Sequence, residues 1–317
     1  MPVASLVRAL SLPSVSRRLR TAAVLGLAAL ACAACGRVEK DRPLEAVIAA
    51  AAGGDARSVR DLIRRFPHPD SAVAQKAWEA VIALGPAAEP ALIAALADGD
   101  PSVAEAAAGA LGSVGGKAAV EPLAAALRTW HSRRYVAAWA LGELQDPRAV
   151  PVLIAALGDE DTEVAKYAAR SLIKLGREAT PPLLRALESP AAQVRHYAVR
   201  ALGEIRDERS VEPLLAAAGK LDRETHLWAL GRLGDRRAFP SVAAAVDDPQ
   251  RDVRLTAIQA LKDLGDERAV PLLARTLADP EWMIREWSAR GLESITGNRY
   301  RYRNQHGDEV YPYSLYR

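Results

Sequence analysis

The fold is decided by a stretch that recurs along the chain, ALGELQDPRAVPVLIAAL at residues 140–157. Close copies read ALGEIRDERSVEPLLAAA at 201–218, ALGRLGDRRAFPSVAAAV at 229–246 and ALKDLGDERAVPLLARTL at 260–277. Weaker copies start at Ala80, Ala110 and Ser171, and a truncated copy starts at Gly291. Self-similarity at a fixed period is the signature of a repeat protein, in which each unit is one supersecondary element.

The period is about thirty residues. The apolar residue that follows the first small residue of each copy serves as its anchor, and the anchors are Val81, Leu111, Leu141, Leu172, Leu202, Leu230, Leu261 and Leu292. Successive anchors lie 28 to 31 residues apart. So regular a series does not arise by chance, and it predicts seven full units with a partial eighth.

Each unit is predicted to hold two helices. The segment before an anchor, such as residues 251–261, has apolar or small residues at three- and four-residue steps, which indicates an amphipathic helix. We call this the anchor helix. A turn with Gly or Asp-x-Arg follows, and a Pro such as Pro151 then opens a second helix, the companion helix, where the missing N–H of proline does no harm.

The composition agrees with closely packed helices. Half of the residues are apolar but only 5% are aromatic, and Phe occurs twice. Ordering about 30 residues costs on the order of 45 kcal/mol of conformational free energy, more than one short helix pair offsets by itself. Neighbouring units must therefore bury each other's apolar faces. The predicted fold class is all-α, an α-solenoid (superhelix) of stacked antiparallel helix pairs.

These units resemble HEAT-like repeats of the type found in phycobilisome lyases. The resemblance rests on the G-D-x-R-A-V-P turn and covers residues 71–297. It implies about seven to eight HEAT-like repeats, but it does not specify a function, because such repeats serve as scaffolds in unrelated systems. Arg133 and Asp222 depart from the pattern, since an aliphatic residue usually stands eight positions before the anchor.

The segments on either side of the array differ from it. Residues 44–70 are predicted to form N-terminal capping helices, with a turn at Gly53-Gly54. Residues 298–317 form a C-terminal tail rich in Tyr and Arg. Two interpretations of this tail stay open: it folds over the last repeat as a cap, or it recognises a partner.

The N-terminus has the pattern of an export signal. Residues 1–20 carry four Arg and no acidic residue, and residues 21–34 carry no charge. Those 14 residues span about 21 Å as a helix, short of a hydrocarbon core of about 30 Å. A signal sequence is therefore expected rather than a membrane span.

Small residues precede both Cys32 and Cys35, which resembles the lipobox of bacterial lipoproteins. The resemblance implies a signal peptide over residues 1–31, lipidation of Cys32 with Cys35 as the alternative, and a linker over 32–43. It further implies a membrane anchor in the bacterial cell envelope, with outer-membrane placement facing the periplasm, because the second residue after the Cys is Ala34 or Arg37 and not the Asp that retains such proteins at the inner membrane. An ordinary cleavable signal with incidental cysteines stays open.

Processing changes the charge of the chain. The formal net charge of +3 includes four Arg in residues 1–34, so removal of that segment leaves −1. The rest of the chain then has no excess of basic residues that would attract nucleic acid, and no nucleic-acid partner is expected.

A candidate binding surface follows from rows of residues two, five, six and nine positions before the anchors. They share the helix face opposite the apolar stripe, and in HEAT-like solenoids the anchor helix lines the concave side. Trp, Tyr and Arg are the residues enriched at binding hot spots. The candidate partner-binding residues are Tyr135, Trp139, Tyr167, Arg170, His196, Tyr197, Arg200, Trp228, Trp287 and Arg290. The alternative is that the aromatic rings are half-buried between neighbouring anchor helices.

A further row lies seven positions before the anchor and consists of Arg134, Arg195, Arg223, Arg254 and Arg285. We expect these to pair with Asp of the preceding turn in a structural ladder; the alternative is a row that binds anions. Motifs for catalysis are missing from the sequence: it has no H-E-x-x-H, no G-x-S-x-G, no Walker loop, and no Cys after Cys35. No catalytic residue, metal site or cofactor is predicted.

The sequence thus predicts a non-catalytic scaffold or adaptor lipoprotein that binds a protein or peptide along the concave face. The alternative is a lyase- or isomerase-like protein acting on a small cofactor or chromophore, as in the phycobilisome lyases that share these repeats. The identity of the partner, the pathway and the oligomeric state do not follow from the sequence.

Overall fold

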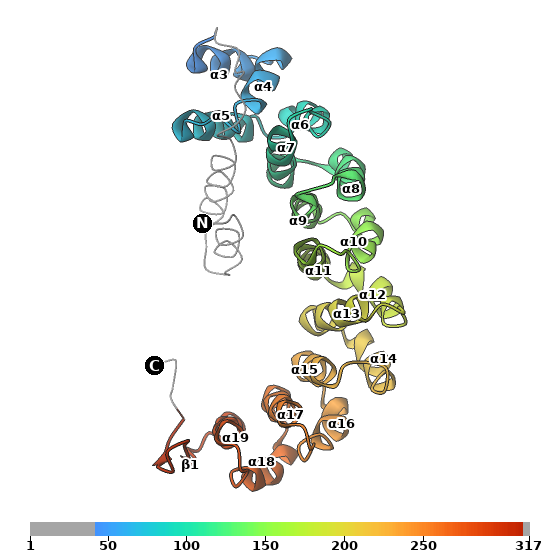
Figure 1. Ribbon diagram of the computed structural model, residues 1–317, viewed down its shortest axis with the longest axis vertical. Helices are drawn as coiled ribbons and strands as arrows, with labels where there is room; N and C mark the ends of the chain where they lie inside the picture. Colours follow the sequence, from blue (N-terminus) through green and yellow to red (C-terminus); the bar gives the residue numbers. More distant parts are fainter. Residues whose placement is uncertain (1–41, 313–317) are drawn as a thin grey trace. The chain divides into compact units, whose positions relative to one another are not determined.

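The computed structural model describes residues 42–312, and these form helix pairs in sequence order (Figure 1). The predicted all-α solenoid is confirmed. Residues 1–31, Cys32, Cys35 and the last five residues lie outside the described part, so the signal peptide and the lipidation site stay predictions. The chain divides into two compact units that meet between Leu175 and Gly176.

The first unit holds a leading helix and four helix pairs. Its helices are α3 (Leu44–Ala52), α4 (Ala56–Ile63), α5 (Ser71–Leu84), α6 (Glu89–Ala95), α7 (Pro101–Val114), α8 (Val120–Thr129), α9 (Arg134–Leu144), α10 (Val150–Ala156) and α11 (Thr162–Leu175). The anchor helices α7, α9 and α11 pack side by side in this order, and each also packs against the companion helix before it.

The second unit holds four further pairs and a short hairpin. Its elements are α12 (Thr180–Ala186), α13 (Ala192–Ile205), α14 (Val211–Ala216), α15 (Arg223–Leu233), α16 (Phe239–Ala243), α17 (Arg251–Leu264), α18 (Val270–Thr276), α19 (Trp282–Thr296), β1 (Tyr302–Arg303) and β2 (Glu309–Val310). Here the anchor helices α13, α15, α17 and α19 pack in series.

The predicted register is confirmed by burial. All eight anchors, from Val81 to Leu292, have 0% of their surface exposed. Ala168, Ala198 and Ala257, on the stripes of their anchor helices, are also fully buried. Small side chains at these positions allow neighbouring helices to approach closely, and the apolar surface that they hide supplies the free energy of stacking.

The turn after each anchor helix forms as its sequence predicts. Gly176, Gly234 and Gly265 adopt positive φ where the helix ends, the conformation that glycine tolerates best. Asp146 then accepts the backbone N–H of Arg148 at 2.9 Å and caps the short 3₁₀ turn that leads into α10. Asp207, Asp235 and Asp266 make the same contact in the second unit.

The arginine of this motif joins one repeat to the previous one. Arg148 binds Asp146 and also donates to the carbonyl oxygen of Lys117 at 2.7 Å. In the second unit Arg209 reaches the carbonyl oxygen of Arg177 at 2.9 Å in the same way. The motif therefore fixes the local turn and the spacing between repeats.

The predicted Asp–Arg ladder is present in part, and the expected partner was wrong. Three arginines of the row pair with an Asp, whereas Arg195 and Arg285 donate to backbone carbonyl oxygens. Arg254 pairs with Asp279, with Nε 3.2 Å from Oδ2. Asp279 lies in the following link, the loop that joins the next companion helix to its anchor helix. Towards the preceding link it reaches only backbone, donating to the carbonyl oxygen of Asp248 at 3.0 Å. Arg134 pairs with Asp159 in the same forward sense, at 2.6 Å. The reach of the long guanidinium across to the next link, rather than sequence distance, decides the pairing.

Both departures from the repeat pattern have structural roles. Asp222 caps α15 by accepting the backbone N–H of Thr225 at 2.9 Å. Arg133 precedes α9 with a positive φ of 60°, and its side chain is paired with Glu105 of α7. Polar residues replace the aliphatic residue at these positions because they start a shorter anchor helix.

Residues 44–70 contain α3 and α4. Since α4 packs against both α5 and α6, it acts as the companion helix of the first pair, and the helix pairs begin before residue 71. By length and composition alone, Ser71–Ala95 is the one stretch among residues 42–312 that could span a membrane. The positive φ of Gly85 separates it into α5 and α6, whose Trp78 and Leu92 are buried in the repeat core.

The described part of the tail folds back on the last helix. Strands β1 and β2 pair antiparallel, and Tyr302 is buried where β1 contacts α19. Arg285 of α19 donates to the carbonyl oxygens of Arg303 at 2.7 Å and Asn304 at 3.3 Å. Residues up to Pro312 thus cover the end of the array.

Candidate functional site

The ten candidate residues fall into two groups, one in each unit. In the first unit Tyr135 and Trp139 lie on α9, and Tyr167 and Arg170 lie on α11. In the second unit His196, Tyr197 and Arg200 lie on α13, Trp228 on α15, and Trp287 and Arg290 on α19. Each group is described separately.

The first group is a packed tyrosine pair. The ring centroids of Tyr135 and Tyr167 are 5.3 Å apart, and the Arg170 guanidinium lies over the Tyr167 ring at 5.3 Å. Tyr167 is only 6% exposed. The expectation that Tyr167 offers its ring to a partner is therefore corrected: the ring is almost fully covered and packs against Tyr135 and Arg170 instead.

A buried carboxylate lies beside this pair. Tyr135 donates its hydroxyl to Glu105 at 3.4 Å, and Arg133 forms an ion pair with the same carboxylate. Burial raises the pKa of Glu105, although Arg133 lowers it in part. Burial also raises the pKa of Tyr135 and of Tyr167, and for Tyr135 the charge of Glu105 adds to the effect. Both tyrosines are therefore neutral phenols at pH 7.

Two tryptophans owe their positions to glycines on the preceding anchor helix. A Cβ added at Gly112 would lie 2.8 Å from the Trp139 ring, and one added at Gly203 would lie 3.0 Å from the Trp228 ring. The missing side chain leaves room for each indole to lie against the helix backbone. Trp139 and Trp228 are thereby half-buried, with one part of each ring still exposed.

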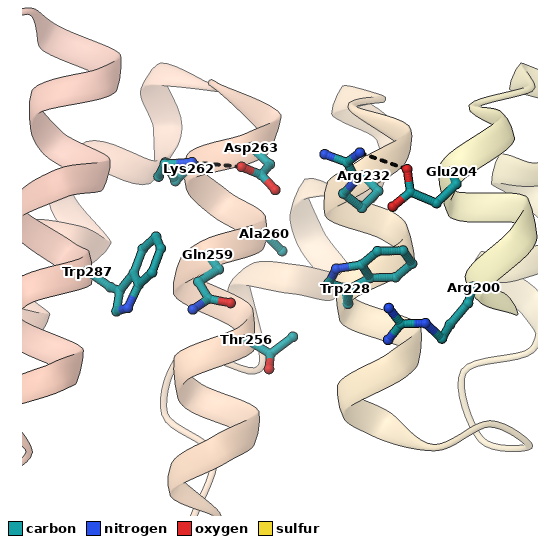
Figure 2. A pocket seen from close by; sticks show the side chains of 10 residues that line it. All are labelled: Arg200, Glu204, Trp228, Arg232, Thr256, Gln259, Ala260, Lys262, Asp263 and Trp287. Atoms are coloured by element: carbon teal, nitrogen blue, oxygen red, sulfur yellow. Dashed lines mark hydrogen bonds and ion pairs between the residues drawn. The ribbon is translucent and has the colours of Figure 1, made fainter. Parts of the chain in front are cut away.

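The second group includes a groove of about 380 Å³. Figure 2 shows Trp228 on one side and Trp287 on the other, with Thr256 and Gln259 of α17 between them. Arg200 extends from α13 towards Trp228, and its guanidinium lies 4.6 Å from the ring centroid. On the opposite side, Lys262 and Arg290 lie 6.0 Å and 5.3 Å from the Trp287 ring centroid.

Most charges of the groove are paired. Arg232 binds Glu204 at 2.8 Å, Lys262 binds Asp263 at 2.9 Å, and Arg290 binds Glu286 at 2.6 Å. Arg200 has no carboxylate within ion-pair distance among residues 42–312. The groove therefore combines two indole rings, paired charges at its rim and one free guanidinium.

His196 and Tyr197 lie next to the groove without lining it. Their rings meet edge to face at 5.5 Å. The Thr225 hydroxyl donates to Asp222 at 2.7 Å, so it accepts from Nδ1 of His196 at 3.2 Å, which places the proton of the neutral ring on Nδ1. Burial, and then the nearby charge of Arg200, lowers the pKa of His196, so the ring is neutral at pH 7.

The groove also contains residues that the candidate set lacked. Glu204 and Arg232 stand two positions after their anchors, and Lys262 and Asp263 stand one and two positions after theirs. A residue two before an anchor and one two after it are four apart, so they lie on one helix face. Extending the rows past the anchor would have found these residues.

The arrangement is suited to binding. Indole rings and guanidinium groups provide apolar contact and directed hydrogen bonds, as at protein interfaces. In residues 42–312 no group of three or more His, Cys, Asp or Glu is arranged to hold a metal ion.

Comparison with known families identifies the repeats. The HEAT repeats family matches residues 59–135, 131–190 and 220–293, together more than half of the chain. The phycobilisome lyase HEAT-like repeat matches residues 194–220. No match was found among curated proteins.

Several solved structures are similar in part. A phycocyanin lyase complex from a Nostoc species is 26% identical over 65% of this chain and 76% of its own, with a TM-score of 0.40. Human deoxyhypusine hydroxylase is 21% identical over 78% and 99%, with a TM-score of 0.34. The YibA protein of Escherichia coli is 16% identical over 78% and 97%, with a TM-score of 0.45.

Proposed function

Because the chain belongs to the HEAT-repeat family, we propose that it is a non-catalytic scaffold or adaptor. It binds a protein or peptide partner through the exposed face of its anchor helices. The groove between Trp228 and Trp287 is the observation that carries this proposal. A half-buried indole needs few new contacts to lose its remaining water, and its position is already fixed before a partner arrives.

The first unit supports the proposal with a second surface. Trp139 lies over Gly112, and Tyr135 is backed by Tyr167 and Arg170. These side chains are held in one orientation, so binding costs little rotamer entropy. We therefore expect binding contacts on both units, with the larger contribution from the groove of the second.

Site-specific photo-crosslinking tests the binding face. A photoreactive amino acid replaces Gln259 at the base of the groove, and in the control it replaces the exposed Arg185 on the companion helix α12. In intact cells we expect discrete crosslinked products from position 259 and none from position 185. Equal crosslinking at the two positions would refute the anchor-helix face as the binding surface.

We further propose that the chain is a lipoprotein of the bacterial cell envelope, anchored through Cys32 or Cys35 and facing the periplasm. The N-terminal sequence, basic at first and then uncharged, supports this localisation. Labelled palmitate should enter the wild-type chain, but not a variant with both cysteines changed to Ser. Single variants then identify which cysteine is modified, and labelling of the double variant would exclude this anchor.

The lyase- or isomerase-like alternative stays a prediction. A chromophore or other conjugated cofactor would give the purified protein an absorbance band in the visible range. A colourless protein that crosslinks a polypeptide through position 259 would favour the scaffold over this alternative.

A further inference from the structure

The groove of the second unit is chemically asymmetric. On the Trp287 side, the nearest cations are Lys262 and Arg290, and each already has a carboxylate partner. On the Trp228 side, Arg200 is exposed and has no carboxylate partner among residues 42–312. One end of the groove therefore presents a charge that no carboxylate within residues 42–312 pairs with.

Arg200 lies against Trp228 and still has donors to offer. Its guanidinium carbon is 4.6 Å from the ring centroid, and no carboxylate among residues 42–312 forms an ion pair with it. The planar fork of a guanidinium suits a carboxylate, which accepts two parallel hydrogen bonds from it. A neutral carbonyl would gain less, because charge-assisted hydrogen bonds are about twice as strong.

No nearby titratable group forms an ion pair with Arg200 among residues 42–312. His196, on the same helix, has its pKa lowered by burial and by Arg200 itself, so it adds no second positive charge at pH 7. The Asp222 carboxylate accepts from the backbone N–H and the hydroxyl of Thr225 instead. Glu204 is paired with Arg232.

The base of the groove offers a second polar contact. The side-chain amide of Gln259 has no hydrogen-bond partner within residues 42–312, and it lies between the two indoles (Figure 2). An amide provides one acceptor and two donors, which matches the N–H and C=O of a peptide unit. The rings on either side offer apolar surface to the side chains of such a peptide.

We infer that this groove selects an acidic peptide segment. An apolar side chain of the segment fits between Trp228 and Trp287, a peptide unit pairs with Gln259, and an Asp or Glu carboxylate binds Arg200. This inference rests on the proposed function and adds the chemistry of the partner to it.

A random peptide library displayed on phage, selected on the immobilised full chain, tests the inference. Parallel selections use Arg200→Gln and the control Arg185→Gln. Arg185 lies exposed on α12 of the same unit and has no carboxylate partner in the described residues, so the control removes the same charge away from the groove. We expect enrichment of Asp and Glu next to an apolar residue with the wild type and R185Q, and no enrichment with R200Q.

The affinity of a selected peptide then gives the size of the effect. Its analogue with Gln and Asn in place of Glu and Asp should bind the wild type about tenfold more weakly by fluorescence anisotropy. With R200Q the two peptides should bind equally. Retention of the acidic preference by R200Q, or selection without acid enrichment, overturns the inference.

Trp228→Leu and Trp287→Leu separate this inference from the proposed function. Peptides that lose binding in both Trp variants but show no acidic preference leave the scaffold proposal standing and refute only the acidic specificity. Peptides that bind both Trp variants as well as the wild type refute the groove as a binding site. Circular dichroism confirms that each variant is folded.

Discussion

At the scale of single residues, glycines one position after the anchor set the distance between anchor helices. A Cβ at Gly112, Gly142, Gly203 or Gly231 would lie 3.1 Å or less from a backbone atom of the next anchor helix. At Gly112 and Gly203 it would also meet the ring of Trp139 or Trp228. This glycine thus allows close helix packing in all four repeats, and in two of them it also makes room for a half-buried indole. Stability and the candidate binding surface depend on the same position.

Gly142→Ala should destabilise the protein. The new Cβ would lie 2.8 Å from Cα of Ser171, a backbone atom that cannot rotate away. Ala is better than Gly inside a helix by about 0.5–1 kcal/mol, but overpacking costs about 1–3 kcal/mol. We expect a net loss of about 1–2 kcal/mol in the free energy of unfolding, measured by urea denaturation.

Gly219→Ala is the control for this substitution. A Cβ there has no atom within 4 Å. Its stability should stay within about 0.5 kcal/mol of the wild type. If the two alanine variants unfold at the same urea concentration, close helix packing at Gly142 is not what sets the stability there.

Asp207 makes the free energy of unfolding depend on pH in the acidic range. Hydrogen bonds from the Arg209 side chain hold the pKa of this carboxyl at about 2, against about 3.9 in an unfolded chain. Because the folded-state pKa is the lower one, the ionised carboxylate stabilises the fold above about pH 4, and this contribution is lost as the pH falls towards 2.

Asp207→Asn should therefore cost on the order of 1 kcal/mol at pH 7, a modest value because Arg209 is half exposed. The difference from the wild type should shrink between about pH 4 and 2. Thermal unfolding across this pH range measures it. Asp247→Asn, which removes only an exposed ion pair with Arg275, is the control and should lose less at pH 7.

At the scale of elements, the interface between neighbouring anchor helices is built on buried alanines. Ala257 of α17 is fully buried where α17 packs between α15 and α19. An alanine contributes little apolar area, but it lets two helix backbones come close, so many atoms of both helices gain contacts.

Ala257→Arg should abolish cooperative folding of the second unit. The interface has no space for the longer side chain and no partner for its charge, and such a change costs several kcal/mol. Ala274→Arg, at an exposed position of the companion helix α18, should change little. Thermal unfolding followed by circular dichroism compares them, and a sharp transition in A257R at the wild-type temperature would contradict the register.

At the scale of the whole molecule, the charge of the chain bears on which partners it attracts. The basic residues of the N-terminal 34 positions account for the positive formal charge, and the remainder is near neutral with a net charge of −1. A chain of this kind lacks the field that attracts nucleic acid non-specifically.

The chain without its first 34 residues should therefore be retained only weakly on a heparin column, with little dependence on salt. Strong retention that falls steeply as the salt concentration rises would indicate a polyanion partner and contradict the predicted absence of nucleic acid. The full-length sequence with its N-terminal arginines provides the comparison that should bind more strongly.

The sequence by itself determined the helix pairs, their register and the buried faces. The same pattern of apolar and polar residues recurs in each repeat. The regular spacing of the anchors, such as Leu141 and Leu172, therefore shows which face of each helix is apolar. The turn motif at Asp146 and Arg148 is equally local, because both of its capping contacts lie within three residues.

Only the tertiary structure decided contacts that cross from one repeat to another. The pairing of Arg254 with Asp279, the covering of Tyr167 and the groove between Trp228 and Trp287 depend on how far adjacent helices are apart and how they are rotated. A helical period places a side chain on a face, but it does not say whether the neighbouring helix covers it or which carboxylate its charge reaches. Nor does it say that Arg200 pairs with no carboxylate of residues 42–312.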